Sequence, residues 1–262
     1  MPLYYLRKLT GKKRTARANR QLGLTLAFVA GATNAGGFLA VAQYTSHMTG
    51  IISSMADNLA LGHVPLALAG LGALFAFIAG AGYSTICINW GRHRHLHSEY
   101  AAPLLAEATL LLGFGLIGGN LDLHQSGYVV PVTVMFLCFL MGLQNAIITK
   151  ISNAEIRTTH MTGIVTDIGI ELGKVFYFNS EPDSPHYKQV HANLTKLKLL
   201  IMLASSFALG GLAGALGFKH IGFASTLPLA AMLVLLAIVP VVDDMRTSVN
   251  LRARMRGRKT GG

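Results

Sequence analysis

The sequence predicts an all-α polytopic membrane protein in which six transmembrane helices form two inverted three-helix repeats. Three observations predict this fold. Hydrophobic residues make up 52% of the chain and charged residues only 13%, whereas soluble domains carry roughly a quarter charged residues. Six apolar stretches reach the ~20 residues that a helix needs to cross a bilayer. Two short motifs also recur in the same order, which indicates an internal duplication.

The six predicted spans are joined by short connections, so the chain has no room for a separate soluble domain. They are Leu22–Tyr44, Val64–Trp90, Ala101–Leu121, Gly127–Thr149, Leu199–Phe218 and Ile221–Val242. A basic stretch before the first span is typical of a signal peptide, but this apolar run is longer than a signal core, so we expect a retained helix. The third span contains an acid, Glu107, and an acid at membrane depth is a functional candidate.

Two recurring motifs divide the membrane domain into a first repeat, residues 22–121, and a second repeat, residues 122–242. The tetrapeptide HMTG at His47–Gly50 returns at His160–Gly163. The pattern G-x-x-N-A precedes both copies, with Asn34 and Asn145 as its asparagines. Two motifs that recur in order at nearly one offset are much stronger evidence of duplication than either match alone.

A short amphipathic stretch follows each HMTG. The two stretches are Ile51–Gly62 and Ile164–Val175. Because both are too short to cross a bilayer, we expect a re-entrant or broken helix in each. Each repeat then has three spans, and an odd number means that the second repeat enters the membrane from the opposite side. Inverted repeats with broken helices in corresponding positions are typical of secondary transporters.

Basic residues gather in residues 1–21, in residues 243–262 and in the loop GRHRHLH at Gly91–His97. The positive-inside rule places all three regions in the cytoplasm, which predicts a multi-pass protein of the cytoplasmic membrane with both termini inside. Anionic lipid is the expected partner of the two tails. Nucleic acid is not expected, because no nucleic-acid-binding fold, aromatic interleaving or zinc spacing accompanies the charge.

The HMTG motif is written like the start of a helix. In Thr49-Gly50 and Thr162-Gly163 a hydroxyl residue precedes a glycine, so we expect threonine to cap free backbone N–H groups and glycine to permit a sharp entry. Capping and packing alone would justify this pattern. Alternatively, the unpaired N–H groups and partial positive charge of a helix start favour an anion or carboxylate in a water-lined cavity.

Histidines, amides and acids complete the candidate site. His47 and His160 precede the two helix starts; each is interpreted as an interfacial residue, as a proton-coupling or substrate group, or, with least support, as a metal ligand. Buried amides are expected to bond between helices or to contact a ligand. The candidate substrate-binding residues are Asn34, His47, Thr49, Gly50, Asn145, His160, Thr162 and Gly163. The coupling candidates are Glu107, Asp57 and Asp167, although the two aspartates are also explained as solvated residues.

Other patterns have structural explanations. Cys87 and Cys138 lie inside apolar spans without metal or disulfide spacing, and neither a metal nor a cofactor is expected. The alternating histidines of Arg92–His97 are better explained by a basic loop facing lipid than by a metal site. Small residues allow close helix packing. The glycines that predict such packing are Gly80, Gly82, Gly115, Gly119, Gly210 and Gly214.

The segment GATNAGGFLAVAQYTSHMTG in the first repeat and GLQNAIITKISNAEIRTTHMTG in the second resemble the two motifs of the YoaK-like family of bacterial six-helix membrane proteins, classed as domain of unknown function 1275. The resemblance covers both repeats. Asn34 stands where the family pattern usually has an acid, and Ile51 where it usually has an asparagine. The resemblance implies the six-helix fold and a bacterial inner membrane, but no substrate.

Three function classes are compatible with these patterns. We expect a secondary transporter or permease for a small metabolite, because inverted duplication and paired broken helices are typical of that class; the helix starts would favour an anionic one. The chain has no phosphate-binding loop for ATP. The first alternative is a scaffold or partner subunit without a substrate, and a homo-oligomer is compatible with the sequence. An intramembrane enzyme is less favoured, since no hydrolase or metalloprotease motif is present.

Overall fold

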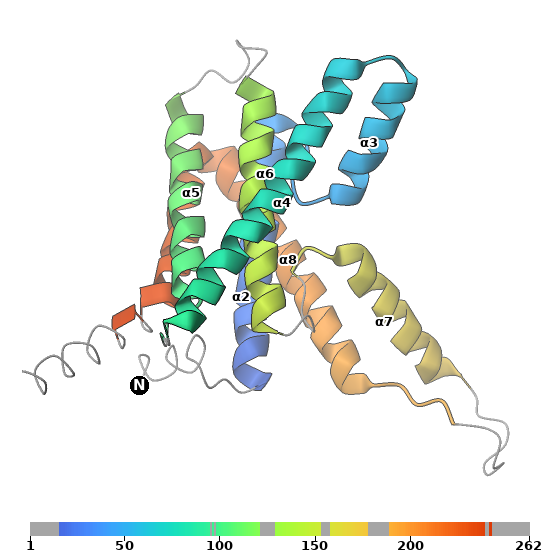
Figure 1. Ribbon diagram of the computed structural model, residues 1–262. Coiled ribbons are helices and arrows are strands. Elements are labelled where there is room, and N and C mark those ends of the chain that lie inside the picture. The colour runs from blue at the N-terminus through green and yellow to red at the C-terminus, as the bar shows by residue number, and fades with distance from the viewer. Residues whose placement is uncertain are drawn as a thin grey trace, which may run out of the picture.

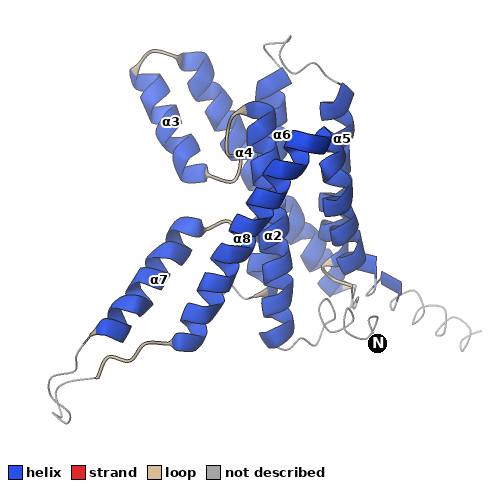
Figure 2. Ribbon diagram, turned by 180° about the vertical axis from the view of Figure 1, so that it is seen from behind, coloured by secondary structure: helices blue, strands red, loops and turns tan. Residues whose placement is uncertain are grey.

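The computed structural model describes residues 16–94, 96, 98–120, 129–152, 158–177, 189–238 and 241–242, and the regular elements of these residues are all helices (Figures 1 and 2). The helices are α2 (Ala16–Val41), α3 (Met48–Ala60), α4 (Val64–His93), α5 (Ala101–Asn120), α6 (Val129–Ile151), α7 (Met161–Phe176), α8 (Leu194–Ile221), the 3-10 helix η1 (Gly222–Ser225) and a last helix over 226–238. The predicted tail 243–262 and most of the tail 1–21 lie outside the described residues.

Five stretches of the described residues are long and apolar enough to cross a membrane. The chain is therefore an integral, multi-pass membrane protein. The stretches are Arg17–Val41, Val64–His93, Ala101–Gly119, Val130–Ile151 and Leu194–Ile238. The first four coincide with the first four predicted spans, although their ends differ by several residues.

The fifth stretch joins the two spans that we predicted as Leu199–Phe218 and Ile221–Val242. Its 45 residues would measure ~68 Å as one straight helix, about twice the thickness of the hydrocarbon. Gly222 interrupts it with a φ of 59°, a conformation that glycine adopts at low cost. The helix 226–238, red in Figure 1, runs back toward the lower end of the molecule beyond this turn.

Helices from the two sequence halves pack in crossed pairs, α2 with α8 and α4 with α6. Each of the four helices contains the pattern F-x-x-G, and the glycine of one helix lies against the phenylalanine carbonyl oxygen of its partner. The contacts are Gly31 with Phe207, Gly210 with Phe28, Gly80 with Phe139 and Gly142 with Phe77. Glycine is required here because a Cβ atom would overlap the oxygen, and such small residues allow helices to approach closely in a membrane.

The predicted packing glycines give a mixed result. Gly80, Gly210 and Gly214 lie against the backbone of a neighbouring helix, and Gly115 lies against Thr226, so close packing is confirmed for these four. Gly82 and Gly119 make no such contact within the described part of the chain, because a Cβ atom at either position would meet none of its atoms within 4 Å. Spacing alone does not tell which face of a helix is covered.

The short helices α3 and α7 pack against the long helices that follow them, α3 against α4 and α7 against α8. In Figure 1, α3 runs from the middle of the molecule toward its upper end, and α7 runs from the middle toward its lower end. They contain 13 and 16 residues, or roughly 20 and 24 Å of helix, which is less than a membrane crossing. Both begin three residues earlier than predicted, so that HMTG forms the first turn.

Candidate functional site

The chain before each of the short helices α3 and α7, called the half-length helices below, is held by the asparagine of the G-x-x-N-A motif in the same half. In the first half, the Asn34 side-chain oxygen accepts hydrogen bonds from the Ser46 hydroxyl at 2.9 Å and from the Ser46 backbone N–H at 3.4 Å. In the second half, the Asn145 side-chain oxygen accepts one from the Thr159 hydroxyl at 2.6 Å. The structure thus brings each predicted asparagine to the HMTG motif of its own half, where it fixes the start of the short helix.

The expectation that threonine caps these helices is wrong. The N-cap residues are His47 and His160, and neither makes a side-chain capping bond. Thr49 and Thr162 lie inside the first turn, because the helix begins at the preceding methionine. Within the described residues, the first N–H groups of α3 and α7 thus donate no hydrogen bond to their N-cap side chains, and such groups can bond to water or to a ligand.

The glycine of each motif makes room for the histidine ring. It does not mark a sharp turn of the backbone, contrary to our expectation. A Cβ atom at Gly50 would lie 2.7 Å from His47 Nδ1, and one at Gly163 would overlap the His160 ring. The left-handed residue before α3 is instead Ala42, with a φ of 53°. His47, His160 and the two threonines are exposed on the protein surface, and the two glycines are half-buried.

The three coupling candidates lie in different surroundings. Glu107 on α5 is fully buried, and among the described residues neither of its carboxylate oxygens has a hydrogen-bond partner. Asp57 on α3 is exposed. Asp167 on α7 forms an ion pair with Lys196 of α8 at 3.0 Å. Of the three, Glu107 alone has the buried position that marks acids in ion pathways.

Glu171, which was not among the predicted site residues, fastens α7 to the start of α8. Its carboxylate accepts from Lys174 Nζ at 2.8 Å and from the Asn193 backbone N–H at 2.7 Å. Both bonds lower the pKa of the Glu171 carboxyl below its usual value, and the bond from Lys174 has the larger effect. The signal available in the sequence was an acid on the apolar face of an amphipathic helix, one turn before a lysine.

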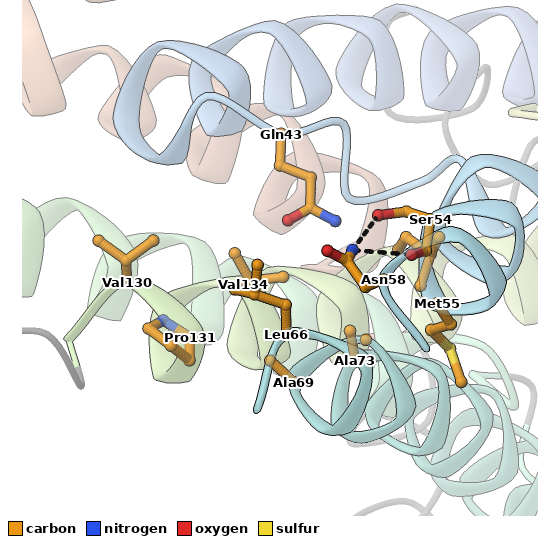
Figure 3. Close-up of a pocket in the computed structure, with 12 residues that line it drawn as sticks. Gln43, Ser54, Met55, Asn58, Leu66, Ala69, Ala73, Val130, Pro131 and Val134 are labelled. Atoms are coloured by element: carbon orange, nitrogen blue, oxygen red, sulfur yellow. Dashed lines mark hydrogen bonds between the residues drawn. The ribbon is translucent and has the colours of Figure 1, made fainter. Parts of the chain in front are cut away.

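A cavity of about 270 Å³ lies between α3, α4 and α6 (Figure 3). Its polar side chains are Gln43, Ser54 and Asn58, and the rest of its lining is apolar. The Asn58 amide nitrogen donates to the Ser54 carbonyl oxygen at 2.7 Å and to the Ser54 hydroxyl at 3.1 Å. Figure 3 shows the Gln43 side chain reaching toward Asn58 across the cavity. Ser54 and Asn58 were not among the predicted site residues. A serine and an asparagine on an amphipathic helix are ordinarily explained as part of its solvent-facing side.

Arg92, in the last turn of α4, is hydrogen-bonded to the two residues that precede α5. Arg92 Nε donates to a Glu99 carboxylate oxygen at 3.1 Å, and Arg92 Nη2 donates to the Tyr100 hydroxyl at 2.6 Å. His95 and His97 of the alternating histidine run lie outside the described residues. In the part of the chain that the structure covers, no three His, Cys, Asp or Glu side chains gather as a metal site would need.

Comparison with known proteins gives one match. A family model described as "Protein of unknown function (DUF1275)" matches residues 22–239, which confirms the resemblance found in the sequence motifs. The search of curated proteins and the search of solved structures each return no match. The matched range contains both HMTG motifs, all four F-x-x-G contacts and the cavity.

Proposed function

Because the chain belongs to the DUF1275 family, whose description names no activity, we propose a function from the geometry of its own residues: a secondary transporter or permease for a small metabolite in a bacterial inner membrane. One observation carries the proposal. Two helices too short to cross the bilayer begin near the middle of the molecule at the same motif (Figure 2), each held by an asparagine from the preceding long helix. Broken helices of this kind border the substrate site in many secondary transporters.

We infer that the two halves are an inverted duplication, and two observations support this inference. The F-x-x-G contacts are reciprocal: the first helix of each half packs on the second long helix of the other half, through the same residue types. In Figure 1, α3 and α7 leave the middle of the molecule in opposite directions. In secondary transporters built from inverted repeats, one repeat rocks against the other around a fixed site, and this movement gives alternating access.

The polar groups near the proposed pathway have separate roles. The uncapped N–H groups at the starts of α3 and α7 offer hydrogen-bond donors to a solute that passes them. His47 and His160 are exposed at the starts of the two short helices, and histidine is a side chain that proton-coupled proteins use to carry protons. Glu107 is a second coupling candidate, because it is buried without a partner among the described residues. We propose further that both termini lie in the cytoplasm, where the basic tails would contact anionic lipid.

A scaffold without a substrate is the second candidate, and the close backbone contacts between the crossed helix pairs favour it. Access of water to the HMTG motifs distinguishes a transporter from a scaffold. A transporter must expose one site to each side of the membrane in turn, whereas a scaffold held by packed helices has no such requirement. We assign no catalytic role to the chain.

Thiol accessibility tests the proposal without knowledge of a substrate. In a chain without Cys87 and Cys138, single variants His47→Cys and His160→Cys would be treated with a membrane-impermeant thiol reagent from each side. We expect both positions to be labelled, with access that changes with pH. A Leu26→Cys variant, fully buried in α2, is the matched negative control. Absence of labelling at both motif positions in folded protein would support the scaffold instead.

A further inference from the structure

We propose that the cavity between α3, α4 and α6 binds a small uncharged molecule that carries both hydrogen-bond donors and acceptors, such as a hydroxyl or carboxamide compound. This inference rests on the proposed transport function and names the substrate class of its first half. It also departs from the anion that the helix starts suggested, because the cavity lies along the side of α3 rather than at its N-terminus.

The size and lining of the cavity define the ligand. A volume of about 270 Å³ lies just below the ~300–1,000 Å³ typical of small-molecule sites, so the ligand must be small. Four residues of α3, spaced three or four apart, form one wall of the cavity. These residues are Ile51, Ser54, Met55 and Asn58. The opposite walls come from α4 and α6, so the ligand would touch both halves of the chain.

The polar atoms that face the cavity are neutral and have free bonding capacity. Among the described residues the Gln43 amide makes no hydrogen bond, so it offers both a donor and an acceptor. Both bonds of the Asn58 amide group are made by its nitrogen, which leaves its oxygen as an acceptor. The Ser54 hydroxyl accepts from Asn58 and keeps its own proton to donate. A ligand with donors and acceptors satisfies all three groups.

A charged ligand is disfavoured at this position. None of the residues that line the cavity carries a formal charge. An ion taken from water into surroundings without a counter-charge loses far more free energy than a neutral polar group does. The lining therefore selects for uncharged solutes by the cost of desolvation rather than by a specific contact.

In the second half, the corresponding face of α7 is occupied by ion pairs and a hydrogen bond instead of bordering a cavity. Counted from the motif histidine, Asp167 corresponds to Ser54, and Glu171 corresponds to Asn58. Both acids are engaged, Asp167 with Lys196 of α8 and Glu171 with Lys174 and the Asn193 backbone. At the two positions where α7 is tied by charges, α3 presents neutral groups to a cavity. The halves thus share one frame but differ in the chemistry of this face.

Thermal unfolding of the purified full-length protein tests the ligand class. Acetamide and glycerol serve as neutral probes, and sodium acetate and sodium lactate as charged probes of similar size at matched ionic strength. We expect acetamide or glycerol to raise Tm by ~3 °C at about ten times its Kd, and the charged probes to give no specific shift. Ala69→Leu, which fills the cavity, should abolish the shift. Ala79→Leu, an exposed position on the same helix, is the matched control that should retain it.

A second variant distinguishes loss of ligand binding from misfolding of Ala69→Leu. Gln43→Leu removes one polar group from the cavity wall without adding bulk to the packed helices, and it should also lose the shift. Equal shifts with acetate and acetamide, no shift with any probe, or a shift that survives in Ala69→Leu each overturn the proposal. If the His47→Cys and His160→Cys positions are labelled while the probes fail, the ligand class alone is wrong. If the probes bind while labelling fails, the site stands and transport does not.

Discussion

Replacing Gly210 by alanine tests whether the crossed helix pairs depend on the F-x-x-G contacts. A Cβ atom at Gly210 would overlap the carbonyl oxygen of Phe28 in α2. A backbone oxygen cannot rotate away as a side chain can, so α8 and α2 must separate by ~1 Å. The same displacement opens the reciprocal contact of Gly31 with Phe207, because both contacts join the same two helices.

The adjacent residue provides the reference for the size of the effect. A Cβ atom at Gly211 would lie 3.7 Å from the Gly31 carbonyl oxygen, an ordinary van der Waals contact. Gly211→Ala should therefore gain the ~1 kcal/mol that alanine has over glycine in a helix. Gly210→Ala should gain the same amount and lose ~1–3 kcal/mol or more to overpacking. We expect it to be less stable than Gly211→Ala by ~1–3 kcal/mol or more, since the helix gain is the same in both variants and they differ mainly in this clash.

A buried thiol reports the unfolding of these variants. Cys138 on α6 is fully buried, so a fluorogenic thiol reagent reacts with it only after the helices separate. With Cys87→Ser as the common background, thermal and denaturant unfolding of the two glycine variants can be compared directly. Equal stability of Gly210→Ala and Gly211→Ala would refute the argument that close approach of α2 and α8 holds the fold together.

Two further predictions concern the half-length helices. Asn34→Leu and Asn145→Leu should each lower stability by ~1 kcal/mol because a side-chain hydrogen bond is lost. Ser46→Ala, which removes the hydroxyl that bonds to Asn34, should cost a similar amount and add little when it is combined with Asn34→Leu; fully additive losses would exclude this hydrogen bond as the cause. Because its folded pKa is lowered, Glu171 stabilises the fold above its ordinary pKa of ~4.3 and loses this contribution as the pH falls through the folded value. Thermal scans from about pH 7 to pH 3 should show that loss in the parent and a flatter acid limb in Glu171→Gln.

The main features of the fold could be predicted because the bilayer constrains them strongly. Length and the absence of charge mark the long helices, and the short length of the segments after HMTG marks them as half-length helices. The boundaries were less certain because several residues compete for the cap position. At His47 the histidine precedes the helix and the threonine lies within it, although threonine is the better capping residue in isolation.

The contacts between distant segments could not be predicted in the same way. F-x-x-G is visible four times in the sequence, but the pattern does not state that Gly31 meets Phe207 rather than a residue of its own half. Ser54 and Asn58 have the composition of a solvated helix face, and only the position of α4 and α6 makes them part of a cavity. Their significance depends on tertiary neighbours, which hydrophobic periodicity does not encode.

The two halves share a common structural frame but differ in the side chains on one face of their short helices. The frame consists of the asparagine tether, the histidine seated on glycine and the F-x-x-G contact, and each occurs once or more in both halves with the same kinds of partner. The surfaces differ where α3 carries Ser54 and Asn58 and α7 carries Asp167 and Glu171. A tie through charges resists opening, because separation would leave partly buried ions unpaired. If one half moves more readily than the other, it should therefore be the half of α3, and the labelling of His47→Cys should respond to a neutral solute more strongly than that of His160→Cys.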